Sequence, residues 1–316
     1  MILFRRYGTF FGFLLIVIFF WILRPDTFMT ARNWLNITQQ VSILCVVSFT
    51  MTVVMVGGDF DLSVGSMASL TGIIGAVLMQ HGSPILLAIG ISLLAGLAGG
   101  ILNGLLVTYA RLSAFVATLG TLTLFGGLAL LTSDGKTLFG RSIPEIVGNF
   151  GRGSVPFFGE IRIPYLTLIA VVVLILVAIL LRQTVVGRQL YAVGGNQEAS
   201  RLAGVPVAKL RIMAFAINGI GAAVAGLMLV SRLSSANPTQ GEGLMLNAIA
   251  AVFVGMTFSE EGVPNLFGTL IGVLILGVLS NGLTQLRIDT YVQQILTGII
   301  IISAVMFSSL TKNRHQ

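Results

Sequence analysis

The chain has few charged residues, a single cysteine and two histidines, and each scarcity excludes a class of protein. Charged residues make up 9% of the 316 positions, whereas hydrophobic residues make up 55% and the mean hydropathy is +0.98. A soluble domain carries about 25% charged residues. This chain therefore lacks the polar surface that a water-soluble fold of its size needs, and the composition indicates a protein that lies in a lipid bilayer.

The scarce reactive side chains also argue against catalysis and metal binding. Cys45, the sole cysteine, excludes an intrachain disulfide and a thiolate metal site, and its apolar run is typical of a buried side chain. His81 and His315 have no partner at metal-ligand spacing. Residues 135–137 read Gly-Lys-Thr, but Leu130 replaces the glycine that a phosphate-binding loop requires. We therefore predict no catalytic residue, no metal and no bound cofactor, and the chain is not expected to be an enzyme.

Long apolar runs predict an all-α, polytopic transmembrane bundle of about ten spans within a single domain, 1–316. Backbone groups in hydrocarbon must bond within a helix or a closed barrel, and these runs have helical rather than strand length. The eighth run is too short to cross alone, so it either extends outward through Gly243 and Leu244 or forms a re-entrant or broken helix. The expected spans are Thr9–Leu23, Val41–Val56, Leu62–Met79, Pro84–Val107, Ala114–Thr132, Leu166–Leu181, Ile212–Val230, Asn247–Met256, Phe267–Leu283 and Tyr291–Phe307.

The distribution of lysine and arginine favours an orientation with both termini in the cytoplasm. The external loop 133–165 contains four basic residues, but the other external loops contain only Arg24, Arg32, Arg232 and Arg287. The positive-inside tendency favours the side with more basic residues. That side contains Arg5, Arg6, Arg111, Arg182, Arg188, Arg201, Lys209, Arg211, Lys312 and Arg314. This topology explains the net charge of +7 without nucleic acid, since no basic cluster has interleaved aromatic residues.

Small residues recur at every fourth position in three predicted spans. This spacing lets helices approach closely where lipid supplies no hydrophobic drive for association. It predicts a tightly packed bundle but no particular function. The positions are Gly96, Gly100 and Gly104, then Ala222 and Gly226, then Gly268 and Gly272.

A polar, basic loop at 182–211 separates two strongly apolar spans and is predicted to face the cytoplasm. Asn196 is positioned to cap a short helix that begins at Gln197, and Gly204 fits the left-handed position that ends it. Pro206 suits the first turn of the next helix. A helix of about two turns would present Glu198, Arg201 and Leu202 to a soluble partner. The alternative is an ordinary solvated connection, but caps at both ends favour docking.

Several polar residues lie in or beside the spans. Asp61 is predicted to cap the helix that opens at Leu62, in preference to a proton-relay role, because neither it nor Asp59 has an evident charged partner in a neighbouring span. The segment Ser231–Gly243 is either a substrate-cavity lining or an ordinary external loop. Polar residues within spans serve either helix packing or a substrate pathway. The candidate pathway residues are Asn103, Thr118, Thr121, Asn218, Asn247 and Asn281.

Five blocks of sequence then point to a family. They are GGDFDLSVGS at Gly57–Ser66, NGLLVTYARLSAFVATLGTLTLFGGLALL at Asn103–Leu131, GRQLYAVGGNQEASRLAGV at Gly187–Val205, RLSSANPTQGEG at Arg232–Gly243 and GTLIGVLILGVLSNGL at Gly268–Leu283. In this order they resemble the ribose-type permeases, the membrane subunits of bacterial ABC importers for monosaccharides. The resemblance runs from about Trp34 to Phe307.

The resemblance implies an inner-membrane permease that imports a monosaccharide or a related small polyol. Its expected partners are a cytoplasmic ATP-binding subunit that holds ATP and Mg, an extracytoplasmic sugar-binding protein, and a second permease chain, identical or not. The short helix would be the coupling helix that docks into the ATPase. Its predicted residues are Gly195, Asn196, Glu198, Ala199, Arg201, Leu202 and Gly204. The alternative is an ion-coupled secondary transporter, for which the spans offer almost no ionisable groups.

Two stretches depart from the family pattern. Met245–Asn247 stands where the family usually has Glu-Leu-Asp, so both acids are lost. Gly255–Asn265 replaces a glycine-rich turn and brings Glu260 and Glu261 to a predicted inner turn. These departures leave the sugar undetermined and would suit a subunit that pairs with a non-identical second permease.

Overall fold

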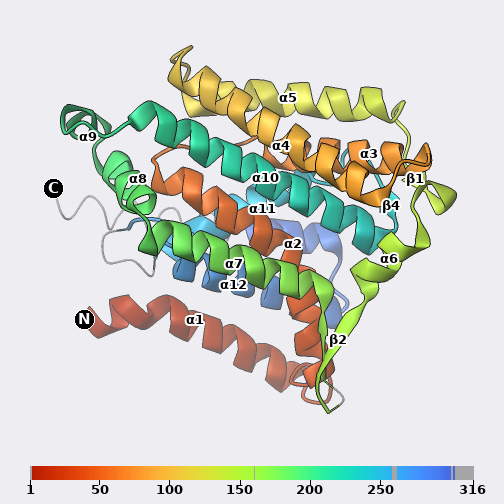
Figure 1. Ribbon diagram of the computed structural model, residues 1–316. Coiled ribbons are helices and arrows are strands. Elements are labelled where there is room, and N and C mark those ends of the chain that lie inside the picture. Colours follow the sequence, from red (N-terminus) through yellow and green to blue (C-terminus); the bar gives the residue numbers. More distant parts are fainter. Residues whose placement is uncertain (1, 160, 258–261, 300–301, 303–316) are drawn as a thin grey trace.

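A computed structural model describes residues 2–159, 161–257, 262–299 and 302, and these residues form a bundle of long helices with two small antiparallel sheets (Figure 1). The helices are α1 (Ile2–Leu23), α2 (Ala31–Val56), α3 (Val64–Gln80), α4 (Ile85–Thr108), α5 (Ala114–Thr132), α6 (Glu145–Arg152), α7 (Tyr165–Gln183), α8 (Val185–Gly195), α9 (Gln197–Leu202), α10 (Val207–Leu233), α11 (Glu242–Met256) and α12 (Leu266–Gln285). A 3-10 turn covers Gly140–Ser142, and residues 290–299 are also helical. The predicted all-α fold class is confirmed.

The observed helices match the predicted spans closely. In the described part of the chain, α2, α4, α5, α7, α10 and α12 are long and apolar enough to cross a membrane, and α3, α11 and part of α1 are shorter apolar helices. α5 has the predicted bounds. α11 begins at Glu242, so the eighth span does extend outward through Gly243 and Leu244. The tenth predicted span is described as helix over 290–299.

α2 begins ten residues before the predicted span, because polar residues in its first turns find partners. Thr30 caps the helix and accepts a hydrogen bond from the backbone N–H of Asn33 at 3.2 Å. The Asn33 amide donates to the carbonyl of Phe28, and the Gln39 amide donates to the carbonyl of Gly151 in the loop that follows α5. Since these groups are satisfied by the protein, the helix tolerates them.

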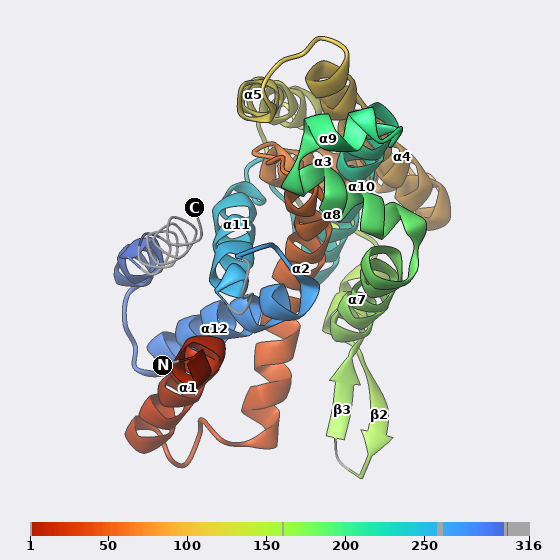
Figure 2. The same ribbon diagram turned by 90° about the vertical axis from the view of Figure 1, so that its left-hand side faces the viewer.

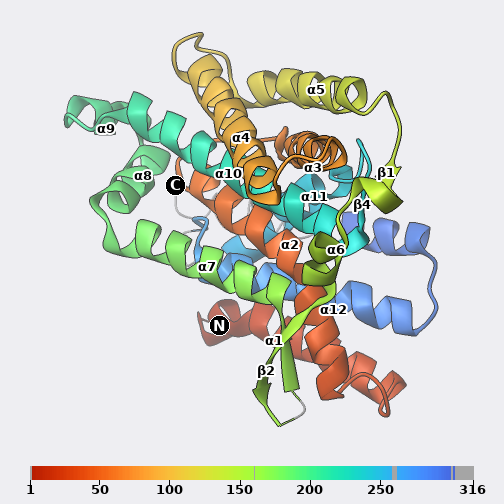
Figure 3. The same cartoon turned by 45° about the vertical axis from the view of Figure 1, so that its right-hand side comes forward.

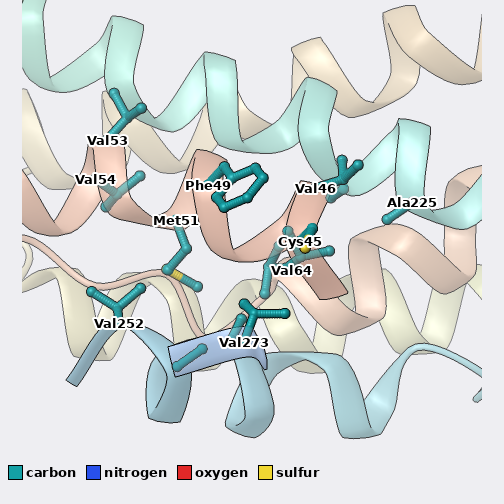
Figure 4. Packing of buried hydrophobic residues seen from close by; sticks show 14 of the residues in the cluster. Cys45, Val46, Phe49, Met51, Val53, Val54, Val64, Ala225, Val252 and Val273 are labelled. Carbon is teal, nitrogen blue, oxygen red and sulfur yellow. The ribbon is translucent and has the colours of Figure 1, made fainter. Parts of the chain in front are cut away.

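The core is centred on α2. In its most apolar stretch, 83% of the residues are buried, against 22% for α7. Figure 4 shows Phe49, Met51 and Val54 of α2 in the cluster with Ala225 of α10, Val252 of α11 and Val273 of α12. α4, α5 and α7 cover this core and expose many large apolar side chains. Such faces suit contact with lipid.

The glycine-rich spacing predicts close helix packing, and the structure confirms it at α4. A Cβ at Gly96 would collide with the carbonyl of Gly219, one at Gly100 with the carbonyl of Phe215, and one at Gly104 with Ile212. α4 therefore packs against α10 backbone to backbone, as Figure 3 shows where the two helices cross. Gly268 and Gly272 make equally close contacts with Gly255 and Ala251 of α11, and Gly226 with Ala68 of α3.

Two connecting segments run back into the bundle, and they explain why α3 and α11 are short. Residues 57–63 return from the end of α2 to the middle of α10, where Asn218 bonds Asp61. Residues 234–241 return along α3 from the level of Ile73 to Gly65, and Gly241 packs on Gly65. α3 and α11 thus begin near each other inside the bundle. Non-helical backbone at this depth is tolerated because it is buried in protein.

The loop 133–165, which is predicted to be external, is folded rather than extended. β1 (Leu138–Phe139) pairs with β4 (Ser235–Ala236), and β2 (Ser154–Phe158) pairs with β3 (Ile161–Pro164) in a hairpin that projects beyond α7 (Figure 2). The Ser231 hydroxyl donates to the carbonyl of Val147 in α6. These bonds tie the loop that follows α5 to the loop that follows α10. Part of Ser231–Gly243 is therefore paired to the loop 133–165, and its last residues lie along α3.

Candidate functional site

α9 has the two caps that the sequence predicts. The Asn196 side chain accepts from the backbone N–H of Ala199 at 2.9 Å. At the other end Gly204 has φ +81, its N–H donates to the carbonyl of Arg201, and the N–H of Val205 donates to the carbonyl of Ser200. This pair of bonds is the Schellman arrangement, which a left-handed glycine completes without strain. Pro206 directly precedes the first residue of α10.

α9 lies at one tip of the molecule and turns almost all of its surface outward. Ser200 is its only buried residue, whereas Leu202 is 82% exposed. Glu198 and Arg201 approach to 4.0 Å, but both side chains are largely in solvent, so the pair adds little to stability. In Figures 1 and 3, α9 projects beyond the end of α10. A short helix that is capped at both ends and exposes a leucine and opposite charges is a candidate docking surface.

The loop also contains a second helix, α8, which the sequence analysis missed. The Thr184 hydroxyl caps α8 by accepting a hydrogen bond from the backbone N–H of Gly187. Leu190 and Val193 of α8 are buried against the rest of the bundle. The Tyr191 hydroxyl donates to the carbonyl of Pro264, two residues before α12 begins. Burial raises the pKa of Tyr191, and the charge of Arg182 opposes that shift. The sequence did contain a signal for α8, because Thr184 is a residue type that favours the N-cap position, from which its side chain accepts from a backbone N–H three residues later.

Asp61 is the centre of a buried polar cluster. One carboxylate oxygen accepts from the backbone N–H and the hydroxyl of Ser63, at 2.9 and 2.6 Å, and the other accepts from the Asn218 amide at 2.8 Å. The Asn103 amide donates to the Ser63 hydroxyl, and the Thr121 hydroxyl donates to Asn103. Buried carboxylates require such donors. The cluster joins α4, α5 and α10 to the segment that precedes α3.

This arrangement corrects the predicted role of Asp61. The helix opens at Val64 rather than Leu62, and Ser63 precedes its first residue. Asp61 therefore bonds the backbone just before the helix and cross-links distant spans, which spacing along the chain alone does not reveal. The pathway role of Asn103, Thr121 and Asn218 stays a prediction, and their hydrogen bonds within the chain already account for polar residues in these spans.

Asp59 has a charged partner, contrary to the expectation from sequence. The Arg211 guanidinium donates to both carboxylate oxygens, at 2.7 Å from Nε and 2.6 Å from Nη2. The side chains are only 15% and 10% exposed. Arg211 lies in the second turn of α10, 152 positions from Asp59, so the pairing depends on the fold. A bidentate pair of this kind fixes orientation as well as distance.

The other predicted residues are spread over several helices. Thr118 is buried, and its hydroxyl donates to the carbonyl of Ala114. Asn247 is half-buried on α11, and Asn281 is buried on α12, where it accepts from Gln285. Their pathway role also stays a prediction. Glu260 and Glu261 lie outside the described residues.

Comparison with known proteins gives a consistent family. Residues 33–305 match the family described as the permease component of branched-chain amino acid transport systems. The ribose import permease protein of Bacillus subtilis is 39% identical over 96% of this chain and 92% of its own length. The D-allose transport system permease protein of Escherichia coli is 34% identical over 96% of this chain and 92% of its own length.

Two further comparisons agree. The L-arabinose ABC transporter permease protein of Azospirillum brasilense is 34% identical over 92% of this chain and 84% of its own length. Among solved structures, an inward-facing metal-chelate type ABC transporter has a TM-score of 0.54 at 16% identity, and the match covers 95% of this chain and 98% of that one. At this identity the structural likeness extends to the fold alone.

Proposed function

The chain belongs to the permease family of ABC importers, and we propose that it moves a monosaccharide or a related small polyol across the bacterial inner membrane. The description of the matching family refers to branched-chain amino acid transport. However, the ribose, allose and arabinose permeases match this chain over most of their own lengths, and this similarity carries the proposal. The multi-pass helical architecture fits a membrane subunit.

We propose that a separate cytoplasmic subunit binds and hydrolyses ATP with Mg, and that this subunit docks on α9. The exposed surface of α9, capped at both ends, supports this assignment. The chain itself then performs no covalent chemistry. The start of α1 and α9 lie at the same end of the bundle in Figure 1, which agrees with a cytoplasmic N-terminus. The C-terminus is proposed to lie on the same side, from the distribution of basic residues.

The pathway is proposed to run along the exposed face of α11, beside a second permease chain. Glu242 is exposed although Gly241, next to it, packs against Gly65 inside the bundle. A carboxylate at such depth is costly against acyl chains and therefore faces water or protein. Leu246, one turn further on, is 58% exposed, and Asn247 is half-buried. An extracytoplasmic binding protein would deliver the sugar to the opposite end, where β1 and β4 join two external loops.

The decisive experiment is reconstitution in liposomes with the ATPase subunit and the sugar-binding protein. Sugar uptake should require ATP and should proceed without a proton or sodium gradient. Uptake by the permease chain alone under an ion gradient would instead establish the ion-coupled alternative. Co-elution of the ATPase with the detergent-solubilised chain is the accompanying binding measurement, and loss of co-elution on shortening α9 would support the docking site.

A further inference from the structure

We propose that the ion pair between Asp59 and Arg211 is the link that transmits movement of α9 to the segment 57–63, and through it to Phe60. The inference rests on the proposed function, since it concerns the coupling step of that transport cycle. Arg211 and Asp59 are therefore positioning residues. They are not expected to touch sugar or nucleotide.

Both flanks of α9 contact the segment 57–63 or the residue directly before it. α8 ends directly before α9, and a Cβ at its Gly194 would collide with the carbonyl of Val56, where the segment begins. α10 follows α9, and its Arg211 makes the bidentate pair with Asp59. A displacement of α9 thus reaches residues 57–63 from two sides. One contact is made through the backbone and the other through a bidentate ion pair, so α9 cannot move far without moving residues 57–63.

Residues 57–63 contain two anchored acids with an exposed aromatic residue between them. Asp59 is held by Arg211, and Asp61 is held by Ser63 and Asn218, so both acids point into the protein. Phe60 lies between them, is 38% exposed, and has its ring centroid 6.0 Å from that of Phe253 on α11. An exposed aromatic residue between two anchored acids has a constrained backbone. A shift of the Asp59 end therefore changes how Phe60 meets Phe253.

Phe253 lies on the same face of α11 as Glu242 and Leu246. These positions differ by 4 and 7 residues, and such spacing places side chains in one helical stripe. The Phe60–Phe253 contact then lies at the inner end of the surface that we assign to the pathway. Movement of Phe60 would open or close that end.

The test compares uptake with ATP hydrolysis in the same proteoliposomes. Asp59→Asn and Arg211→Gln each should lower the sugar moved per ATP hydrolysed by about tenfold, within the usual range of coupling effects. The double variant Asp59→Asn/Arg211→Gln leaves no unpaired buried charge, so it should fold and yet remain uncoupled. Arg111→Gln, which removes an exposed cation from the α4–α5 connection, is the control and should transport normally. Normal coupling in the folded double variant would overturn the proposal.

A second readout separates transmission from a structural role. Phe60→Cys is introduced with Cys45→Ala, so that the new thiol is the sole cysteine, and it is labelled with a water-soluble maleimide. With the ion pair intact, the labelling rate should change severalfold between the nucleotide-free complex and the complex trapped with ATP and vanadate. With Asp59→Asn added, this difference should vanish. An unchanged difference would refute transmission through the pair. Absence of ATP-driven uptake in the unmodified complex would instead contradict the proposed function.

Discussion

Truncation of Leu202 to alanine should weaken ATPase docking without destabilising the permease. The side chain is 82% exposed in the free chain, so folding gains almost nothing from it. Leu→Ala removes three carbons, each worth about 0.8 kcal/mol when buried. Multiplied by the exposed fraction of Leu202, this gives a loss of binding free energy of about 2 kcal/mol, which raises the dissociation constant roughly 30-fold. This figure assumes that the partner buries the side chain fully, as central interface residues often are.

The assay is titration of detergent-solubilised permease with labelled ATPase subunit, followed by thermal unfolding of the permease alone. The matched control is Leu233→Ala, which removes an exposed leucine at the other end of α10, where Leu233 is 54% exposed. The control should bind the ATPase normally. Equal affinity of the Leu202 variant and the unmodified chain would refute docking through this face of α9. A lowered unfolding temperature of the Leu202 variant would contradict the reasoning from exposure.

Three other outcomes follow from described contacts. Glu198→Lys combined with Gly204→Pro should abolish uptake with the protein still inserted, because proline cannot adopt the φ of +81 that ends α9; normal uptake with bound ATPase would exclude the coupling role. Asn218→Leu should lower the free energy of unfolding by about 2–3 kcal/mol, since a buried carboxylate loses a donor, and chemical denaturation would measure this. Asn247→Cys with Cys45→Ala should react with a water-soluble thiol reagent at a rate that substrate alters; inertness in every state would remove Asn247 from the pathway.

Local signals predicted much of this structure. Asn196 and Gly204 act within a few residues of their own positions, so the caps of α9 follow from sequence spacing. The glycines of α4 predict a close partner, although only the fold shows that the partner is α10. Apolar length fixes most helix bounds, and α5 has the same first and last residues as the segment expected from hydropathy.

Apart from α8, whose Thr184 cap is a local contact, the missed features depend on contacts between distant residues. Asp59 finds Arg211 across 152 positions, and no local pattern marks that pair. α2 extends past its apolar run because Gln39 reaches a carbonyl 112 positions away. The sequence predicts that Asp61 caps a helix that opens at Leu62, but residues 57–63 run back into the bundle, where Asp61 binds side chains of two other spans. Tertiary partners, rather than propensity, decided these positions.

The backbone contact between α4 and α10 restricts how the molecule can deform. Gly96 and Gly219 touch without intervening side chains, so no rotamer change can absorb sliding of one helix along the other. α4 and α10 should therefore move together as one rigid unit during any conformational cycle. Hinge or shear movement must then fall where helices meet through side chains, as α7 and α12 do on α2, where Thr167 meets Ser42 and Thr269 meets Thr52. Distances measured by spectroscopy between α4 and α10 should stay constant during the cycle, while distances from these two helices to α12 should change.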